Sequence, residues 1–194
     1  MPSFELKKSE KFSLAKATAK FTVGVGWDTE IDLDASAFAC VSNGGNPKFY
    51  NDGSHAVFYG NRSLKQSDGS FVTSDGSIRH SGDNLNGIDR AGTKDDEEIQ
   101  INTDKLPAEI DEIGIFVTIY DAAAKEKSFA DVRDAYVRII DNSGVELCRY
   151  NLSNEFSSAS VQVGNLIKEN GEWAFHAIGA GFNQEIGAII EKLS

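Results

Sequence analysis

The alternation of apolar and polar positions predicts a chain built mainly from short strands. Residues 21–25 (FTVGV) and 98–103 (EIQINT) alternate as half-buried strands do, and residues 35–41 (ASAFACV) form the short apolar run of a buried strand. The most apolar run, residues 113–120 (IGIFVTIY), is predicted to be the central strand. Residues 55–60 (HAVFYG) follow an Asp-Gly turn and are predicted to form a further strand.

Turn residues join the later strands into hairpins. Residues 135–141 and 145–152 are predicted strands on either side of the turn DNSG. Residues 160–182 contain Asn170-Gly171, a dipeptide that strongly favours a two-residue hairpin turn. Residues 183–193 (NQEIGAIIEKL) are predicted to form a short helix at the C-terminal end.

The spacing of these elements predicts the fold class. About eight to ten short strands with turns every 8–12 residues are typical of a sandwich of two antiparallel sheets. We therefore expect a mainly β protein, an antiparallel β-sandwich with short helices. No linker composition interrupts the chain of 194 residues, so a single domain over residues 1–194 is expected.

Charge and cysteine content narrow the possible partners. The formal net charge is −11 and the calculated pI is about 4.7. This balance disfavours nucleic acid, whose phosphates an acidic surface repels, and favours cations or basic surfaces. Cys40 and Cys148 lie in apolar runs and are predicted to be buried free thiols. The N-terminal residues lack the apolar stretch of a signal peptide, and no run is long enough for a membrane span, so we expect a cytoplasmic protein.

One segment, residues 80–99 (HSGDNLNGIDRAGTKDDEEI), concentrates six acidic residues and three glycines. It could be a solvated turn, a pair of catalytic carboxylates, or a cage for a hard cation. Calcium takes about six to eight oxygen ligands from carboxylates, amides, carbonyls and water, and glycines allow the tight bends such a cage needs. The segment is not an EF-hand, because placing Gly87 at the sixth position of that loop puts Thr93 where the final Glu belongs.

A second acidic stretch, residues 26–36 (GWDTEIDLDAS), supplies two further carboxylates. Asp32 and Asp34 are two positions apart, so on a strand they point to the same face. Two carboxylates on one face form half of a metal site, and the 83–97 loop is the expected donor of the rest. The alternative is that both stretches are solvated acidic surface.

Several motifs in order resemble one family. They are GWD (26–28), DLDASAF (32–38), HSGDNLNG (80–87), DDEEI (95–99), IYDA (119–122) and GEWAFHAIGAGF (171–182). Together they resemble the TerD family of tellurium-resistance and stress proteins. The resemblance implies a calcium-binding β-sandwich with no established enzymatic activity, holding one or two calcium ions. It places the metal ligands on Asp32, Asp34, Asp83, Asn84, Asp95, Asp96 and Glu97, with the backbone carbonyl of Leu85 as a further oxygen.

The chain departs from the family pattern in two segments. Residues 86–94 (NGIDRAGTK) are about three residues longer than the corresponding part of the family loop and place Ile88 where a Glu is expected. Asp89 is the candidate replacement for the lost acid, and we expect this segment to weaken or reshape one of the two expected calcium sites. Residues 61–73 are also longer than usual and contain the first copy of a repeated SDGS, which we interpret as a loop variation.

Three functions follow as hypotheses. The first is a non-enzymatic calcium-binding protein linked to tellurite resistance and general stress response, whose acidic loop recruits other tellurium-resistance or stress proteins. The second is a calcium-dependent membrane module that works like a C2 domain at the inner face of the membrane, for which Ile88, Arg90 and Lys94 are candidate loop-tip residues. The third is a metal-dependent hydrolase, which needs a cleft with a perturbed base. We assign no catalytic residue.

Overall fold

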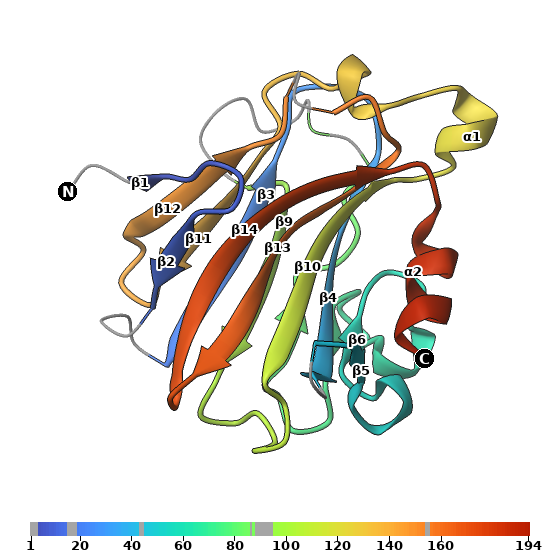
Figure 1. Ribbon diagram of the computed structural model, residues 1–194. Coiled ribbons are helices and arrows are strands. Elements are labelled where there is room, and N and C mark those ends of the chain that lie inside the picture. The colour runs from blue at the N-terminus through green and yellow to red at the C-terminus, as the bar shows by residue number, and fades with distance from the viewer. Residues whose placement is uncertain (1–3, 15–18, 43–44, 86, 88–94, 154–155) are drawn as a thin grey trace.

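The computed structural model describes residues 4–14, 19–42, 45–85, 87, 95–153 and 156–194. Two β-sheets pack face to face, and the described strand pairs are antiparallel except that β1 pairs with β12 in parallel (Figure 1). The predicted antiparallel β-sandwich is therefore confirmed.

The first sheet contains the strands that precede and follow the acidic loop. Its order is β1 (Phe4–Glu5), β12 (Glu146–Asn151), β11 (Tyr136–Asp141), β3 (Lys20–Gly26), β9 (Glu97–Asn102), β8 (Ile78–His80) and β7 (Phe71–Val72). The predicted hairpin around DNSG is present as β11 and β12. The first SDGS segment lies just before β7 and the second lies in the β7–β8 turn, and in each the Asp (Asp68 or Asp75) accepts the backbone N–H two residues later.

The second sheet contains the most apolar strands. Its order is β2 (Lys11–Ser13), β14 (Glu172–Phe182), β13 (Ser160–Glu169), β10 (Glu112–Ile119), β4 (Leu33–Ser42) and β5 (Pro47–Phe49), with β6 (Ala56–Val57) also paired to β4. Strand β10 lies between β4 and β13, as its continuous apolar sequence predicted. The strand predicted over residues 55–60 is shorter than expected, since only Ala56 and Val57 pair.

The β13–β14 turn confirms the Asn-Gly signal. Asn170 and Gly171 have φ values of 52° and 86°. A type I′ turn needs positive φ at both central positions, and Asn followed by Gly is the pair that adopts this conformation most readily. Strands β13 and β14 are therefore joined by the turn that the sequence predicted.

Helices are short and lie outside the two sheets. The α-helices are α1 (Ala122–Lys125) and α2 (Ile186–Leu193), and the 3₁₀-helices are η1 (Tyr50–Gly53), η2 (Arg62–Leu64) and η3 (Phe129–Asp131). The predicted C-terminal helix is thus confirmed as α2, whose Ile189 and Leu193 are buried with Phe38 and Phe116 of the second sheet (Figure 1). Within the described ranges, no helix has both the length and the apolar character needed to cross a membrane.

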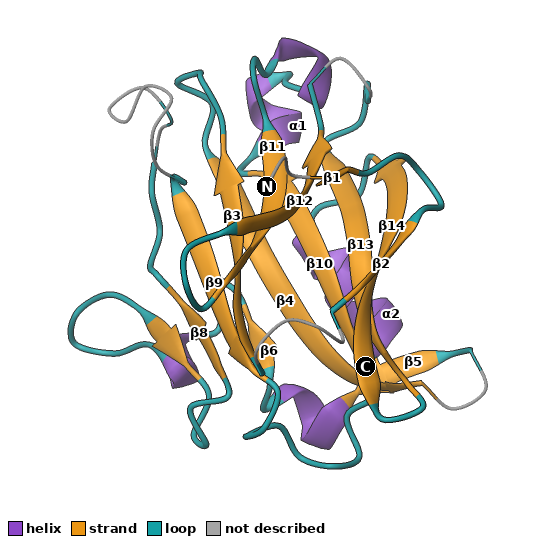
Figure 2. Ribbon diagram, turned by 90° about the vertical axis from the view of Figure 1, so that its left-hand side faces the viewer, coloured by secondary structure: helices purple, strands orange, loops and turns teal. Residues whose placement is uncertain are grey.

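Strand β4 is buried on both of its faces. The acidic side chain of Asp34, at the start of this strand, is therefore buried as well. Leu33, Ala35 and Ala37 point into the core between the sheets, while Phe38 belongs to the separate cluster under α2. Asp34 lies at the start of the strand, on the same face as Ser36 and Phe38, and all three are buried. Strand β9 of the first sheet lies close to β4, so acids of β9 can reach it (Figure 2).

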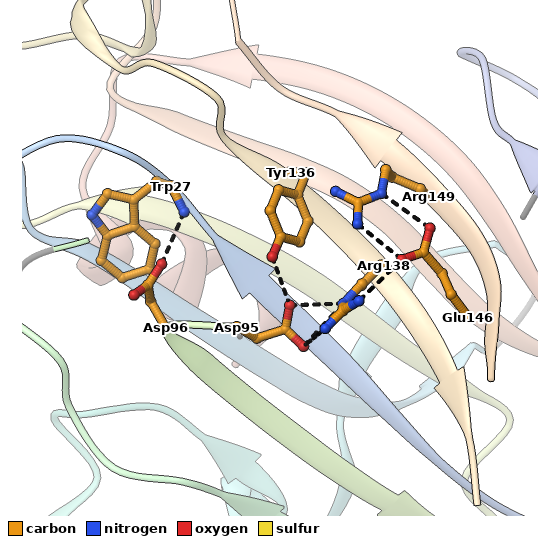
Figure 3. Close-up of polar contacts among 7 residues, drawn as sticks. All are labelled: Trp27, Asp95, Asp96, Tyr136, Arg138, Glu146 and Arg149. Carbon is orange, nitrogen blue, oxygen red and sulfur yellow. Dashed lines mark hydrogen bonds and ion pairs between the residues drawn. The ribbon is translucent and has the colours of Figure 1, made fainter. Parts of the chain in front are cut away.

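The first sheet carries a connected polar network on its outer face (Figure 3). Asp95 accepts hydrogen bonds from the Arg138 guanidinium at 2.8–3.1 Å and from the Tyr136 hydroxyl at 3.0 Å. Glu146 accepts from Arg138 at 3.1 Å and from Arg149 at 2.8 Å. The Arg149 guanidinium carbon lies 3.9 Å from the centroid of the Tyr136 ring. These contacts join the start of β9 to β11 and β12 across β3.

Two glycines of β3 make room for this network. A Cβ atom at Gly24 would overlap the Asp95 carboxylate, and one at Gly26 would overlap the Tyr136 hydroxyl group. The two glycines are two positions apart, so a side chain at either position would project from the same face of the strand. The sequence GVG in β3 therefore serves close packing on the outer face of the first sheet.

Replacing Gly24 with Ala is expected to destabilise the protein. The new methyl group displaces the buried Asp95 carboxylate from Arg138, and separating such a pair costs about 3 kcal/mol. We expect the melting temperature to fall by roughly 5–10 °C in thermal denaturation. The matched control is Gly187→Ala in α2, where a Cβ meets no atom within 4 Å and the helix gains stability. A Gly24→Ala protein that melts no lower than the parent contradicts the role assigned to this glycine.

Candidate metal centre

Three carboxylates from two distant segments converge at one end of the sandwich. Asp32 and Asp34 come from the start of β4, and Asp83 comes from the loop that follows β8. One oxygen from each carboxylate can be chosen so that all three lie within 4.8 Å of one another. Oxygen ligands about 2.3–2.6 Å from one calcium ion can be at most about 5 Å apart, so this spacing fits a shared cation.

Two of these carboxylates have buried oxygens that lack a hydrogen-bond partner. Asp34 is 3% exposed, and its Oδ2 atom receives no hydrogen bond. The Oδ1 atom of Asp32 is also buried and receives no hydrogen bond. A buried carboxylate oxygen without a partner is costly, and a bound cation is one of the few ways to remove that cost. The geometry is thus better suited to holding a cation than to forming a solvated turn.

Burial and mutual repulsion perturb the acids of this cluster. Burial, together with the charges of Glu97, Asp32 and Asp83, raises the pKa of Asp34 to about 8. Burial and the charge of Asp83 raise the pKa of Asp32 to about 6. The charge of Lys125 lowers both pKa values but does not outweigh these causes. Without a metal, the cluster therefore retains a proton near neutral pH, which a cation must displace.

Glu97 holds the loop that carries Asp83 against β4. Its carboxylate accepts a hydrogen bond from the backbone N–H of Ala35 at 2.7 Å and from that of Asn84 at 3.1 Å. The His80 Nε2 atom lies 3.3 Å from the same carboxylate. Because Ala35 belongs to β4 and Asn84 follows Asp83, the Glu97 side chain fixes how closely the two segments approach.

The neighbouring acids Asp96 and Asp95 point in different directions (Figure 3). Asp96 accepts from the backbone N–H of Trp27 at 3.0 Å and from the Asn84 side-chain amide at 3.4 Å. Asp95 faces Arg138 and Tyr136 on the outer face of the first sheet. The structure therefore places Asp95 outside the carboxylate cluster.

The nine residues predicted as ligands thus divide into groups. Asp32, Asp34 and Asp83 converge, whereas Asn84, Asp96 and Glu97 form hydrogen bonds that position the loop. The Leu85 side chain is 64% exposed and lies at the same pocket as the cluster. Asp89 lies outside the described residues, as do Ile88, Arg90 and Lys94.

The carboxylate cluster opens into a pocket of about 570 Å³. Four of the residues that line it were not predicted from the sequence as part of the site, and they are Tyr59, Arg62, Lys65 and Tyr120. Tyr120 belongs to the family-like motif IYDA, which is the signal that could have identified it. Arg62 and Lys65 lie in the lengthened 61–73 segment, which the sequence indicated only as a loop variation.

Comparison with known protein families identifies the family of this chain. The profile of the TerD domain matches residues 2–193. The chain belongs to the TerD domain family. The resemblance predicted from the sequence motifs is thereby confirmed.

Relatives of this TerD-family chain match it over most of their length. The tellurium resistance protein TerD of Serratia marcescens is 39% identical, with 96% of this chain and 95% of the relative covered. General stress protein 16U of Bacillus subtilis (strain 168) is 37% identical with the same coverage. A crystal structure of a homologue of telluride resistance protein (TerD) from Streptomyces coelicolor A3(2) has a TM-score of 0.68 at 20% identity, covering 88% of this chain and 94% of that one. This structural likeness supports the fold alone.

The stability of the metal-free protein is expected to fall as pH rises from about 5 to 8. The pKa of Asp34 is about 8 in the folded chain and ordinarily 3.8, so the folded state binds more protons over this interval. Stability is then greatest below the lower value and declines towards the higher one, by no more than about 1.4 kcal/mol per pH unit for one group. Melting temperatures measured in chelator across this range check the direction.

The variant Asp34→Asn provides the test of this assignment, because it cannot ionise. It is expected to melt higher than the parent at pH 8 and to show a flatter pH dependence. Asp104→Asn, which alters an exposed acid elsewhere, is the control and should follow the parent. A parent protein whose stability rises from pH 5 to 8 would show that Asp34 is not the controlling group.

Proposed function

We propose that this chain is a non-enzymatic calcium-binding protein that acts in tellurium resistance and stress response. The observation that carries the calcium assignment is a pair of buried, unpartnered carboxylate oxygens on Asp32 and Asp34, with the Asp83 carboxylate beside them. The biological part of the proposal is supported by the names of relatives, which are resistance and stress proteins.

The chemistry of the cluster favours calcium over other common metals. All three candidate ligands are carboxylates, and zinc prefers nitrogen and sulfur ligands. Magnesium requires a near-ideal octahedron and usually retains several waters, whereas calcium accepts irregular arrangements of six to eight oxygens. Three carboxylates completed by water and backbone carbonyls fit the second description. Among the described residues, this cluster supports one ion.

Calcium at this position would act on the loop rather than on a substrate. The ion would compensate the repulsion among the three acids and join the start of β4 to Asp83, alongside the tie that Glu97 already makes. It would also change the charge of a surface that includes the exposed Leu85 side chain. Such a change suits recruitment of a stress-response partner. A hydrolase would need a base free to accept a proton, and here the perturbed acids are the proposed ligands.

Calcium is expected to bind the metal-stripped protein and to raise its melting temperature. Binding to the folded state alone adds about 2.7 kcal/mol of stability when calcium is at 100 times its dissociation constant. Isothermal titration should show an affinity that falls at least about ten-fold in both Asp34→Asn and Asp83→Asn, because each removes one charged ligand. Excess magnesium serves as the selectivity control.

Asp104→Asn is the matched control for the loss of one carboxylate and should bind calcium as the parent does. Thermal denaturation in chelator shows whether each ligand variant remains folded, which separates lost binding from lost structure. The proposal is wrong if the parent gives neither heat nor a shift in melting temperature with calcium, or if both ligand variants bind it with parental affinity.

A further inference from the structure

Two basic side chains share the pocket with the acidic cluster. Arg62 and Lys65 line it together with Asp32, Asp34 and Asp83. They lie at the beginning of η2 and directly after it, and Leu64 between them is buried, which anchors the segment. Both basic side chains are exposed. The pocket therefore offers positive charge next to its negative charge.

These two cations do not act as internal counterions of the cluster. Within the described part of the chain, no ion pair joins Arg62 or Lys65 to a carboxylate. The cation that lowers the pKa of Asp32 and Asp34 is instead Lys125, whose ammonium group lies 5.0 Å from the centroid of the Tyr120 ring. The Lys65 ammonium group lies 5.9 Å from the centroid of the Phe71 ring, a weak contact that an exposed lysine can leave. Both side chains can therefore turn towards a ligand from solution.

A cation bound by the three acids would still have open coordination positions. Calcium takes about six to eight oxygens, and three carboxylates supply only part of that number. Phosphate oxygens are hard ligands for such a cation, and a guanidinium group pairs with phosphate through two parallel hydrogen bonds. A phosphate in this pocket therefore has the chemistry to contact both the ion and the basic pair.

We propose that this pocket binds a phosphate-bearing anion that bridges the cation held by Asp32, Asp34 and Asp83 and the side chains of Arg62 and Lys65. The inference rests on the proposed calcium site and adds a second ligand to it. The two ligands strengthen each other, because the anion supplies oxygens to the ion and the ion supplies charge to the anion.

The remaining walls fit an organic group attached to the phosphate. Tyr59 and Tyr120 lie edge to face with ring centroids 5.7 Å apart, and Tyr120 is 45% exposed. Leu85 completes the apolar part of the rim. A pocket of about 570 Å³ has the size of sites that hold small organic ligands. The ligand class is therefore a phosphomonoester, whether soluble or the headgroup of a lipid.

The test measures calcium affinity with and without a phosphomonoester. Isothermal titration of calcium into metal-stripped protein is carried out alone and with phenyl phosphate. Co-sedimentation with phosphatidic acid vesicles, and with phosphatidylcholine vesicles as control, distinguishes a lipid source from a soluble one. We expect phenyl phosphate or phosphatidic acid to tighten calcium binding about five-fold or more, the lower end of usual coupling between sites.

The double variant Arg62→Gln/Lys65→Gln is expected to lose this coupling. Calcium alone should bind it at least as tightly as the parent, because two positive charges have left the pocket. Lys105→Gln, an exposed lysine that does not line this pocket, is the matched control for lost charge and should retain the coupling.

The outcomes separate this inference from the calcium proposal. Absence of calcium binding in every arm refutes both. Calcium binding that neither phenyl phosphate nor phosphatidic acid changes overturns the anion site alone. Coupling that survives in the double variant also overturns it, because Arg62 and Lys65 are then not the recognising groups. Coupling in the vesicle arm only assigns the site to a lipid headgroup, and coupling with phenyl phosphate only assigns it to a soluble ester.

Discussion

The buried carboxylate of Glu97 is the interaction on which the arrangement of the acidic site depends. The side chain is 1% exposed and would be very unfavourable without partners. Its partners are the N–H of Ala35, the N–H of Asn84 and the ring of His80. The two N–H donors belong to β4 and to the loop after β8, and His80, whose Nε2 atom lies 3.3 Å from the carboxylate without a hydrogen bond, belongs to β8. One buried charge therefore fixes the separation of the two sheets at this end and the position of Asp83 relative to Asp34.

Three consecutive acids point in different directions because the chain bends at Asp96, just before β9 begins. Asp95 reaches Arg138 on the outer face of the first sheet, Asp96 receives the N–H of Trp27, and Glu97 points towards β4. Each of these carboxylates has a protein donor, so each contributes to the scaffold. The acids whose oxygens stay unpartnered are in the other stretch, at Asp32 and Asp34. High acidic content thus reflects two different roles, one structural and one directed at a cation.

The sequence predicted those features that depend on short-range pattern. Alternation identified the main strands, and Asn170-Gly171 identified a hairpin because only positive φ values satisfy that turn. The two-residue spacing placed Asp32 and Asp34 on one face, as the structure has them. These predictions needed no knowledge of how distant segments pack.

The division of the acids could not be predicted in the same way. Whether Asp95 meets a cation or Arg138 depends on the register between β3, β9 and β11, and on glycines at 24 and 26 that clear the space. The basic pair of the pocket depends on how the lengthened 61–73 segment is placed beside Asp32 and Asp34. Long-range packing determines both the partner of Asp95 and the position of the basic pair. Neither feature produces a periodic pattern in the sequence.

The separation of charge within one pocket explains why a cation and an anion suit it together. Burial and the repulsion of neighbouring carboxylates raise the pKa of Asp34, which is the cost of leaving these acids uncompensated. Arg62 and Lys65, which line the same pocket, form no ion pair with these carboxylates in the described part of the chain and so do not relieve that repulsion directly. A cation alone would neutralise the acids while adding repulsion towards the basic pair, and an anion alone would do the reverse. In the proposed site, each bound ion removes the electrostatic repulsion that the other creates. Occupancy of the calcium site would therefore depend on the concentrations of both calcium and the anion, unlike that of a permanently held structural ion.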